Sequence, residues 1–139
     1  MEYTTLGATE LKVSVAGLGC GGNSRLGQST GSTVAESVSI IHRALDLGVN
    51  FFDTAPVYGT EKIIGSALQK IPRDSVVLST KCRIEKNKKL LSAAQIIASL
   101  EQSLLSLQTD YIDVFHLHAV QFKDYEYVCS ELVPALLRE

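Results

Sequence analysis

The residues best suited to chemistry in this chain are Asp53, Tyr58, Lys81 and His118. Three of them lie at the ends of the segments NFFDTA, VVLSTK and IDVFHLH, which we expect to be β-strands, and Tyr58 follows Asp53 by five residues. An acid, a phenol, an amine and an imidazole delivered by consecutive strands indicate a proton-transfer site rather than a packing pattern.

These side chains could act together on a carbonyl or an alcohol. A tyrosine has a reference pKa of about 10, and a nearby ammonium favours the phenolate and lowers that pKa. Lys81 can supply the ammonium, and Asp53 can hold Lys81 in place through an ion pair. His118 can exchange a hydrogen bond with a substrate oxygen. This combination suits protonation of a carbonyl oxygen while a hydride arrives from a nicotinamide.

Each of these residues also has an ordinary explanation when it is taken alone: a turn, a half-buried aromatic, a strand end or a core imidazole. Their joint occurrence favours a site. His116 leaves a second interpretation open, because it shares a strand face with His118 and an HxH pair can bind zinc in a hydrolase. Cys20 and Cys82 have no base partner in the sequence, and we expect them to fill space as small apolar groups.

The elements that must position these residues alternate between strand and helix. Strands are expected over residues 13–19, 49–54, 75–81 and 111–118. Helices are expected over residues 33–47, 61–70, 92–107 and 127–138. Residues 3–13, with a turn at Gly7, are expected to form a hairpin ahead of them. Four such βα units imply a parallel sheet with right-handed crossovers, in which function lies at the carboxyl ends of the strands.

Composition excludes several classes of protein. The chain of 139 residues is 45% hydrophobic and 20% charged, with a formal net charge of −2, which does not favour a nucleic-acid partner. Lys86, Lys88 and Lys89 are expected in a solvated loop. Three widely spaced cysteines argue against a disulfide framework or a structural zinc site. With no signal peptide and no apolar run of about 18–20 residues, we expect a cytoplasmic protein with no membrane partner.

Three further motifs resemble one known family. They are the segment GVNFFDTA with Glu61 and Gly65 after it, the strand VVLSTK, and the run LQTDYID followed by Leu117 and His118. Together they resemble the N-terminal half of the aldo-keto reductases, which are (β/α)8-barrel nicotinamide oxidoreductases. The resemblance covers essentially the whole chain, so the expected fold is α/β, a (β/α)4 half of a TIM-type barrel preceded by a short hairpin.

The resemblance assigns a role to each candidate residue. Tyr58 is implied to be the general acid/base, Lys81 to lower its pKa, and Asp53 to pair with Lys81. His118 is implied to orient the substrate carbonyl. The implied cofactor is NADP or NAD, and no metal is implied. The residues expected to line the nicotinamide end of the cofactor site are Gly19, Cys20, Gly21 and Asp53.

The substrate implied by the resemblance is a small carbonyl compound or a sugar. The segments HAVQF and LVPAL are similar to the sugar-oxidising branch of the family, to which L-galactose dehydrogenases belong, although Ala119 stands where that branch usually has an acid. Gly17, Gly19 and Gly22 also fit GxGxxG, but a Rossmann fold would start its helix at the last glycine and place an acid about 20 residues further on. Asp53 comes too late for that pattern.

The length fits half of the expected barrel, because a (β/α)8 barrel typically needs about 250 residues. We expect one partial barrel domain over residues 1–139. It would be a fragment of a longer reductase, a half that associates with itself or with a complementary half, or an inactive remnant. As an isolated chain it is expected to be weakly active or inactive. A non-catalytic, reductase-like binding or regulatory subunit is the other function that the resemblance leaves open.

Overall fold

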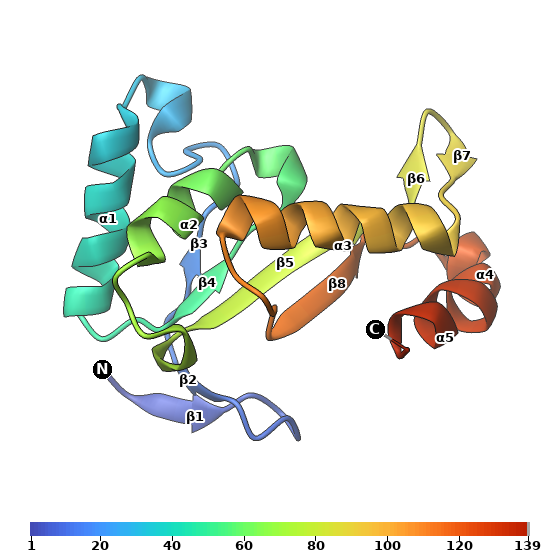
Figure 1. Cartoon of the computed structure of the whole chain (residues 1–139), viewed down its shortest axis with the longest axis horizontal. Coiled ribbons are helices and arrows are strands. Elements are labelled where there is room, and N and C mark those ends of the chain that lie inside the picture. Colours follow the sequence, from blue (N-terminus) through green and yellow to red (C-terminus); the bar gives the residue numbers. More distant parts are fainter. Residues whose placement is uncertain (139) are drawn as a thin grey trace.

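A computed structural model describes residues 1–138 and contains the expected parallel sheet (Figure 1). The sheet has four strands in the order β3-β4-β5-β8. Their bounds are β3 Leu18–Gly19, β4 Phe51–Asp53, β5 Val77–Arg83 and β8 Val114–His118. Every neighbouring pair is parallel. Because each connection between these strands contains a helix, the alternation predicted from the sequence is confirmed.

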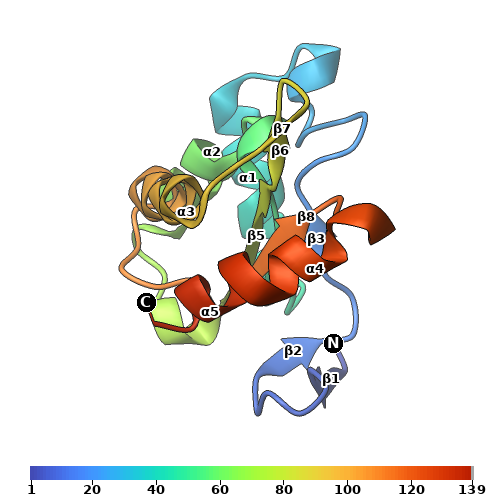
Figure 2. The same cartoon turned by 90° about the vertical axis from the view of Figure 1, so that its right-hand side faces the viewer.

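Three helices cover one face of this sheet: α1 Val34–Asp46, α2 Glu61–Leu68 and α3 Ala93–Leu107. Figure 2 shows them together on the same side of the strands. Both α1 and α3 begin with a capping box, in which Thr33 pairs with Glu36 and Ser92 with Gln95. Each box satisfies backbone N–H groups that the first helical turn leaves without partners.

The buried face of the sheet packs on these helices. Phe52 of β4 is fully buried and Leu78 of β5 is 2% exposed, and both contact a cluster that includes Ile41 of α1 and Ile64 of α2. Side chains alternate along a strand, so Asp53 and Ser79 lie on the opposite face, away from α1, α2 and α3. The core therefore fixes which side of the sheet carries the polar residues.

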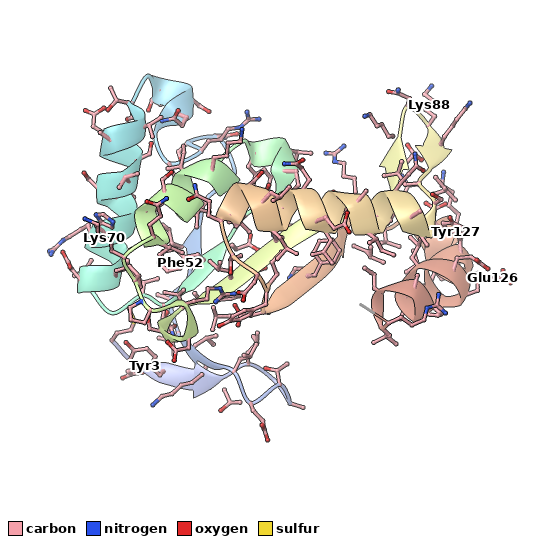
Figure 3. The ribbon with its side chains drawn as sticks, viewed as in Figure 1. Tyr3, Phe52, Lys70, Lys88, Glu126 and Tyr127 are labelled. Carbon is pink, nitrogen blue, oxygen red and sulfur yellow. The ribbon has the colours of Figure 1, made fainter. Side chains whose placement is uncertain are left out.

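A hairpin of β1 Tyr3–Thr5 and β2 Lys12–Ser14 precedes the sheet, with Gly7 at φ 55 in its turn. It is anchored next to β4, because Ser14 N–H donates to Asn50 Oδ1 at 2.7 Å and the Asn50 amide donates to the Lys12 carbonyl at 2.9 Å. Tyr3, labelled in Figure 3, donates its hydroxyl hydrogen to the Gly48 carbonyl at 2.8 Å. The expected hairpin is confirmed.

Three expectations about element limits are corrected. The single strand expected over residues 13–19 is divided, since Val13 and Ser14 pair with the hairpin and only Leu18–Gly19 joins the sheet. Lys81 does not end its strand, because β5 continues to Arg83 alongside His118. The lysine-rich loop contains a small hairpin, β6 Glu85–Lys86 with β7 Lys89–Leu90.

The C-terminal helix expected over residues 127–138 is also irregular. It begins as α4 Tyr125–Tyr127, continues as a π-helix over Val128–Leu132, and ends as α5 Val133–Leu136. Pro134 has no N–H and cannot extend the regular ladder, which accounts for the change of pitch before it. Between residues 1 and 138, no helix has the length and apolarity needed to cross a membrane.

Candidate active site

Asp53 and Lys81 form an ion pair at the carboxyl end of the sheet. Asp53 ends β4 and lies opposite Ser79 of β5, so Lys81 is two residues further along the same strand face. The Lys81 ammonium contacts Asp53 Oδ1, and Ser79 donates its hydroxyl hydrogen to the same oxygen at 2.8 Å. Lys81 is 13% exposed at its side chain and Asp53 38%, so the pair holds the ammonium at the rim of the sheet.

Tyr58 reaches the same place from a short turn after β4. The 3-10 helix Pro56–Tyr58 begins with proline, whose fixed φ suits a first turn, and Gly59 closes it at φ 73. This turn places Lys81 Nζ 5.9 Å from the centroid of the Tyr58 ring. The Tyr58 and His118 ring centroids are 6.2 Å apart, with the planes inclined by 80°. The structure thus brings the four candidate residues together.

His118 ends β8 beside two cations of β5. It is paired in register with Arg83, and His116 is paired with Lys81. Burial lowers the pKa of His118 below 6.5, and the positive charges of Lys81 and Arg83 lower this pKa further. A neutral imidazole at neutral pH can donate or accept a hydrogen bond, which a substrate oxygen requires.

The expected nicotinamide segment adjoins this cluster. Cys20 N–H donates to the Asp53 carbonyl at 2.8 Å, and Thr60 donates its hydroxyl hydrogen to the Cys20 carbonyl at 3.0 Å. A Cβ added to Gly21 would lie 2.5 Å from Cε2 of Tyr58, so only glycine lets the ring approach here. A Cβ added to Gly19 would meet no heavy atom within 4 Å, which leaves open space beside this strand end.

Cys20 itself is not suited to nucleophilic chemistry. It is fully buried, and its burial, reinforced by the charge of Asp53, raises the pKa of the thiol to about 12. The thiol therefore stays protonated and behaves as a small packing group. Cys82 is also buried, within the cluster formed by Ile96 and Leu132.

The zinc interpretation of His116 finds no third ligand. Within residues 1–138, no three potential metal-ligating side chains of His, Cys, Asp or Glu come together. His116 is exposed and stands in register with Lys81, so the pair of histidines shares its strand face with cations. Cationic neighbours disfavour a metal ion at that position.

Three residues with clear roles around the site were not singled out from the sequence. Ser79 binds the Asp53 carboxylate, and Thr80 donates to the buried Glu61 carboxylate at 2.8 Å on the other side of the sheet. Arg83 shares a strand face with Lys81. The signal for Ser79 and Arg83 is the period of two along β5, which places both on the face of Lys81.

A parallel sheet with polar residues gathered at its carboxyl edge is the arrangement of one half of a (β/α)8-barrel enzyme. Comparison with known proteins agrees with this class. Residues 17–137 match the family model described as "Aldo/keto reductase family". The chain therefore belongs to the aldo/keto reductase family, and its fold is the N-terminal (β/α)4 half of the family's barrel.

Individual relatives support the family assignment. The chain is 38% identical to L-galactose dehydrogenase of Arabidopsis thaliana over 142 residues, which cover 98% of this chain and 44% of that protein. It is 39% identical to aldo-keto reductase YhdN of Bacillus subtilis over 128 residues, which cover 85% of this chain and 38% of that protein. The holo form of aldo-keto reductase AKR11C1 from Bacillus halodurans superimposes with a TM-score of 0.79 at 33% identity. The superposition covers 99% of this chain and 46% of that one. The chain thus spans less than half the length of these relatives.

Proposed function

We propose that this chain carries the acid/base half of an NAD(P)(H)-dependent oxidoreductase that interconverts a carbonyl and an alcohol. The observation that supports it best is that the Tyr58 ring lies near both Lys81 and His118, with Lys81 paired to Asp53. This arrangement presents a phenol to a substrate oxygen and keeps a fixed cation beside it. The family assignment supports a nicotinamide as the source of the hydride.

Each residue has a separate task in this proposal. Tyr58 gives its hydroxyl proton to the carbonyl oxygen during reduction and takes it back during oxidation. Lys81 stabilises the negative charge that Tyr58 carries after the proton has left, and Asp53 fixes Lys81 in place. His118, neutral at neutral pH, donates a hydrogen bond that orients the carbonyl.

The nicotinamide end of the cofactor would lie over the strand ends β3 and β4. Gly19, Cys20, Gly21 and Asp53 would hold it, and the absence of any heavy atom within 4 Å of a Cβ on Gly19 supports a ligand at this place. When bound, the cofactor supplies or accepts the hydride. The substrate class that we propose is an aldehyde, ketone or aldose. L-Galactose dehydrogenase is the name of one relative and supports the sugar as a candidate.

We further propose that residues 1–139 act as one partial barrel domain, although Glu139 lies outside the described residues. The polar face of the sheet and its outer strands β3 and β8 would be completed by a second (β/α)4 unit. That unit would come from the same polypeptide, a second copy or a complementary half. Relatives more than twice as long support this arrangement.

The test is reduction of aldehydes, ketones and aldoses, followed by oxidation of NADH or NADPH. Tyr58→Phe removes the proton donor and keeps the ring, so we expect turnover to fall by about 10²–10⁴-fold. Tyr111→Phe is the matched control, because Tyr111 stacks on Arg73 outside the site. Full turnover by Tyr58→Phe would favour a non-catalytic, reductase-like binding or regulatory subunit instead.

A further inference from the structure

Arg83 occupies a place in the site that the proposed proton chemistry does not use. β5 continues two residues beyond Lys81, and alternate residues of a strand face the same side. Arg83 is therefore the next residue after Lys81 on the same strand face, and it ends β5 at the carboxyl edge of the sheet. Its register partner is His118. Arg83 thus lies beside His118 at the carboxyl end of the sheet.

The charge of Arg83 is not satisfied within the described chain. Residues 1–138 contain two ion pairs, Arg73 with Asp113 and Lys81 with Asp53. Arg73 is an arginine with a structural role. Its guanidinium donates hydrogen bonds to Asp113 Oδ2, to the Thr109 hydroxyl and to two backbone carbonyls. It also stacks on the Tyr111 ring, 3.8 Å from the centroid. Arg83 is exposed and makes no side-chain hydrogen bond in the same span.

A hollow in the surface connects Arg83 with two of the proposed acid/base residues, Lys81 and His118. A cavity of about 490 Å³ is lined by Lys81, Arg83 and His118, together with Val57 and the α3 residue Ala98. A drug-sized ligand commonly occupies a cavity of such a volume. A molecule in this cavity would therefore contact Arg83 together with Lys81 and His118, and the Tyr58 ring centroid lies 6.2 Å from that of His118.

The charges around this cavity favour an anion. Asp53 compensates Lys81, which leaves Arg83 and Lys86 facing a single lining acid, Glu85. A smaller adjoining cavity of about 110 Å³ shares Arg83, Glu85 and His118 and adds Asp124 on its far side. The larger cavity is thus the more cationic of the two, and Arg83 lies at their junction.

We propose that Arg83 is a substrate-positioning residue that binds the carboxylate of an acidic carbonyl substrate or of its hydroxy-acid product. The planar guanidinium would grip the carboxylate with two parallel hydrogen bonds. Two strand residues span roughly 6–7 Å, so the carboxylate would lie roughly two to four carbon atoms from the reacting carbon. This inference rests on the proposed function, since it assigns the substrate class of the same site.

The experiment compares two alcohols of the same chain length, one of which carries a carboxylate where the other has a neutral hydroxymethyl group. The 139-residue chain, labelled with ¹³C in its histidines, is titrated with 4-hydroxybutanoate and with 1,4-butanediol while the His118 imidazole signal is followed by NMR. The signal is assigned with His118→Gln. We expect saturable binding of the carboxylate at least tenfold tighter than that of the diol.

Variants of two cationic residues then separate the effect of Arg83 from that of general charge. Arg83→Gln is expected to weaken carboxylate binding at least tenfold and leave diol binding unchanged. Lys88→Gln removes the same charge at the tip of the β6–β7 hairpin, labelled in Figure 3, and is expected to change neither. Unchanged thermal midpoints would show that both variants fold. Arg83→Gln is also expected to raise the pKa of His118, because Arg83 lowers it in the native chain.

The result that overturns the proposal is equal binding of the two alcohols by the native chain, or equal carboxylate binding by native chain and Arg83→Gln. Neither readout needs turnover, so it is independent of the proposed reaction. Tyr58→Phe could keep full turnover while Arg83→Gln no longer binds 4-hydroxybutanoate. That result would contradict the proposed acid/base chemistry and still support carboxylate binding by Arg83.

Discussion

At the scale of single residues, the site depends on a glycine as much as on its polar groups. Gly21 lies two residues after β3 and against the Tyr58 ring. Any side chain at this position would collide with the ring. The position of Tyr58 relative to Lys81 and His118 is therefore set by a missing side chain as well as by the turn over Pro56–Tyr58. A site built this way is sensitive to small changes that leave every catalytic candidate intact.

Gly21→Ala tests this dependence. The new methyl group would lie 2.5 Å from Cε2 and 2.8 Å from Cζ of Tyr58, so the partly exposed ring must swing away. We expect turnover to fall at least tenfold, and the free energy of unfolding to fall by less than the roughly 1–3 kcal/mol typical of overpacking in a closed core. Steady-state assays and thermal unfolding measure the two effects. Ser66→Ala, at an exposed position of α2 outside the candidate site, is the control; equal activity of both variants would contradict the argument.

His118 makes stability depend on pH in a defined direction. Burial and the charges of Lys81 and Arg83 lower its pKa from 6.5, so the unfolded chain binds this proton more tightly than the folded one. Between 6.5 and the lower folded value, the unfolded state carries more protons, and the free energy of unfolding falls as the pH falls. Above that window the contribution does not change with pH.

Urea unfolding at pH values from about 7 to about 5 measures this effect. We expect His118→Gln to lose less stability across that range than the native chain, because it lacks the titrating group. A native slope in His118→Gln would show that other groups cause the acid sensitivity.

At the scale of elements, the contact between α2 and α3 holds the helical layer over β4 and β5. Gly65 of α2 faces the end of α3, where an added Cβ would lie 2.7 Å from the Leu107 carbonyl oxygen and 2.8 Å from that of Ser106. The two helices approach backbone to backbone at this point. Gly65 belongs to the segment whose spacing from Asp53 resembles the family pattern, and its physical role is this close approach.

Gly65→Ala sets two effects of opposite sign against each other. Alanine favours a helix by about 1 kcal/mol over glycine, but here its methyl group meets backbone atoms that cannot rotate away. We expect the clash to win, with a net loss of roughly 1–3 kcal/mol in the free energy of unfolding. Ser66→Ala, on the exposed side of the same helix, should leave stability unchanged or slightly increased. Stabilisation by Gly65→Ala would show that α2 can move outward freely.

The same elements show what the sequence could and could not predict. The positions of Asp53 and Lys81 at the ends of NFFDTA and VVLSTK were sufficient to predict that they meet at one edge of the sheet, because function lies at the carboxyl ends of parallel strands. The structure adds that they share a face, because Phe52 and Leu78 pack on the helices. The end of β5 could not be predicted, since Arg83 is held in the strand by pairing with distant residues of β8. Likewise, one helix was predicted over residues 127–138, but the π-helix Val128–Leu132 was not, because the pitch depends on which backbone carbonyls find partners once Pro134 has no N–H to donate.

At the scale of the whole molecule, the chain carries all four residues that we propose for proton transfer and only some of those that we expect a nicotinamide cofactor to need. The proposed acid/base residues come from β4, β5, β8 and the turn after β4. The residues that we assign to the cofactor are confined to the ends of β3 and β4. The family resemblance implies that later strands and loops supply most contacts to the adenine and pyrophosphate, and this chain spans 44% of one relative and 46% of another.

This division predicts an unusual pattern of cofactor affinity for the 139-residue chain. If its residues contact only the nicotinamide end, reduced nicotinamide mononucleotide should bind about as tightly as NADH or NADPH, and all three only weakly. The adenine half and the 2′-phosphate would find no partners, so they would add no binding free energy. Fluorescence titration of the reduced nicotinamide measures all three affinities under one set of conditions. Gly21→Ala, which disturbs the nicotinamide end, should weaken the three ligands by the same factor. NADPH binding tenfold or more tighter than the mononucleotide would mean that these residues also hold the far end of the cofactor.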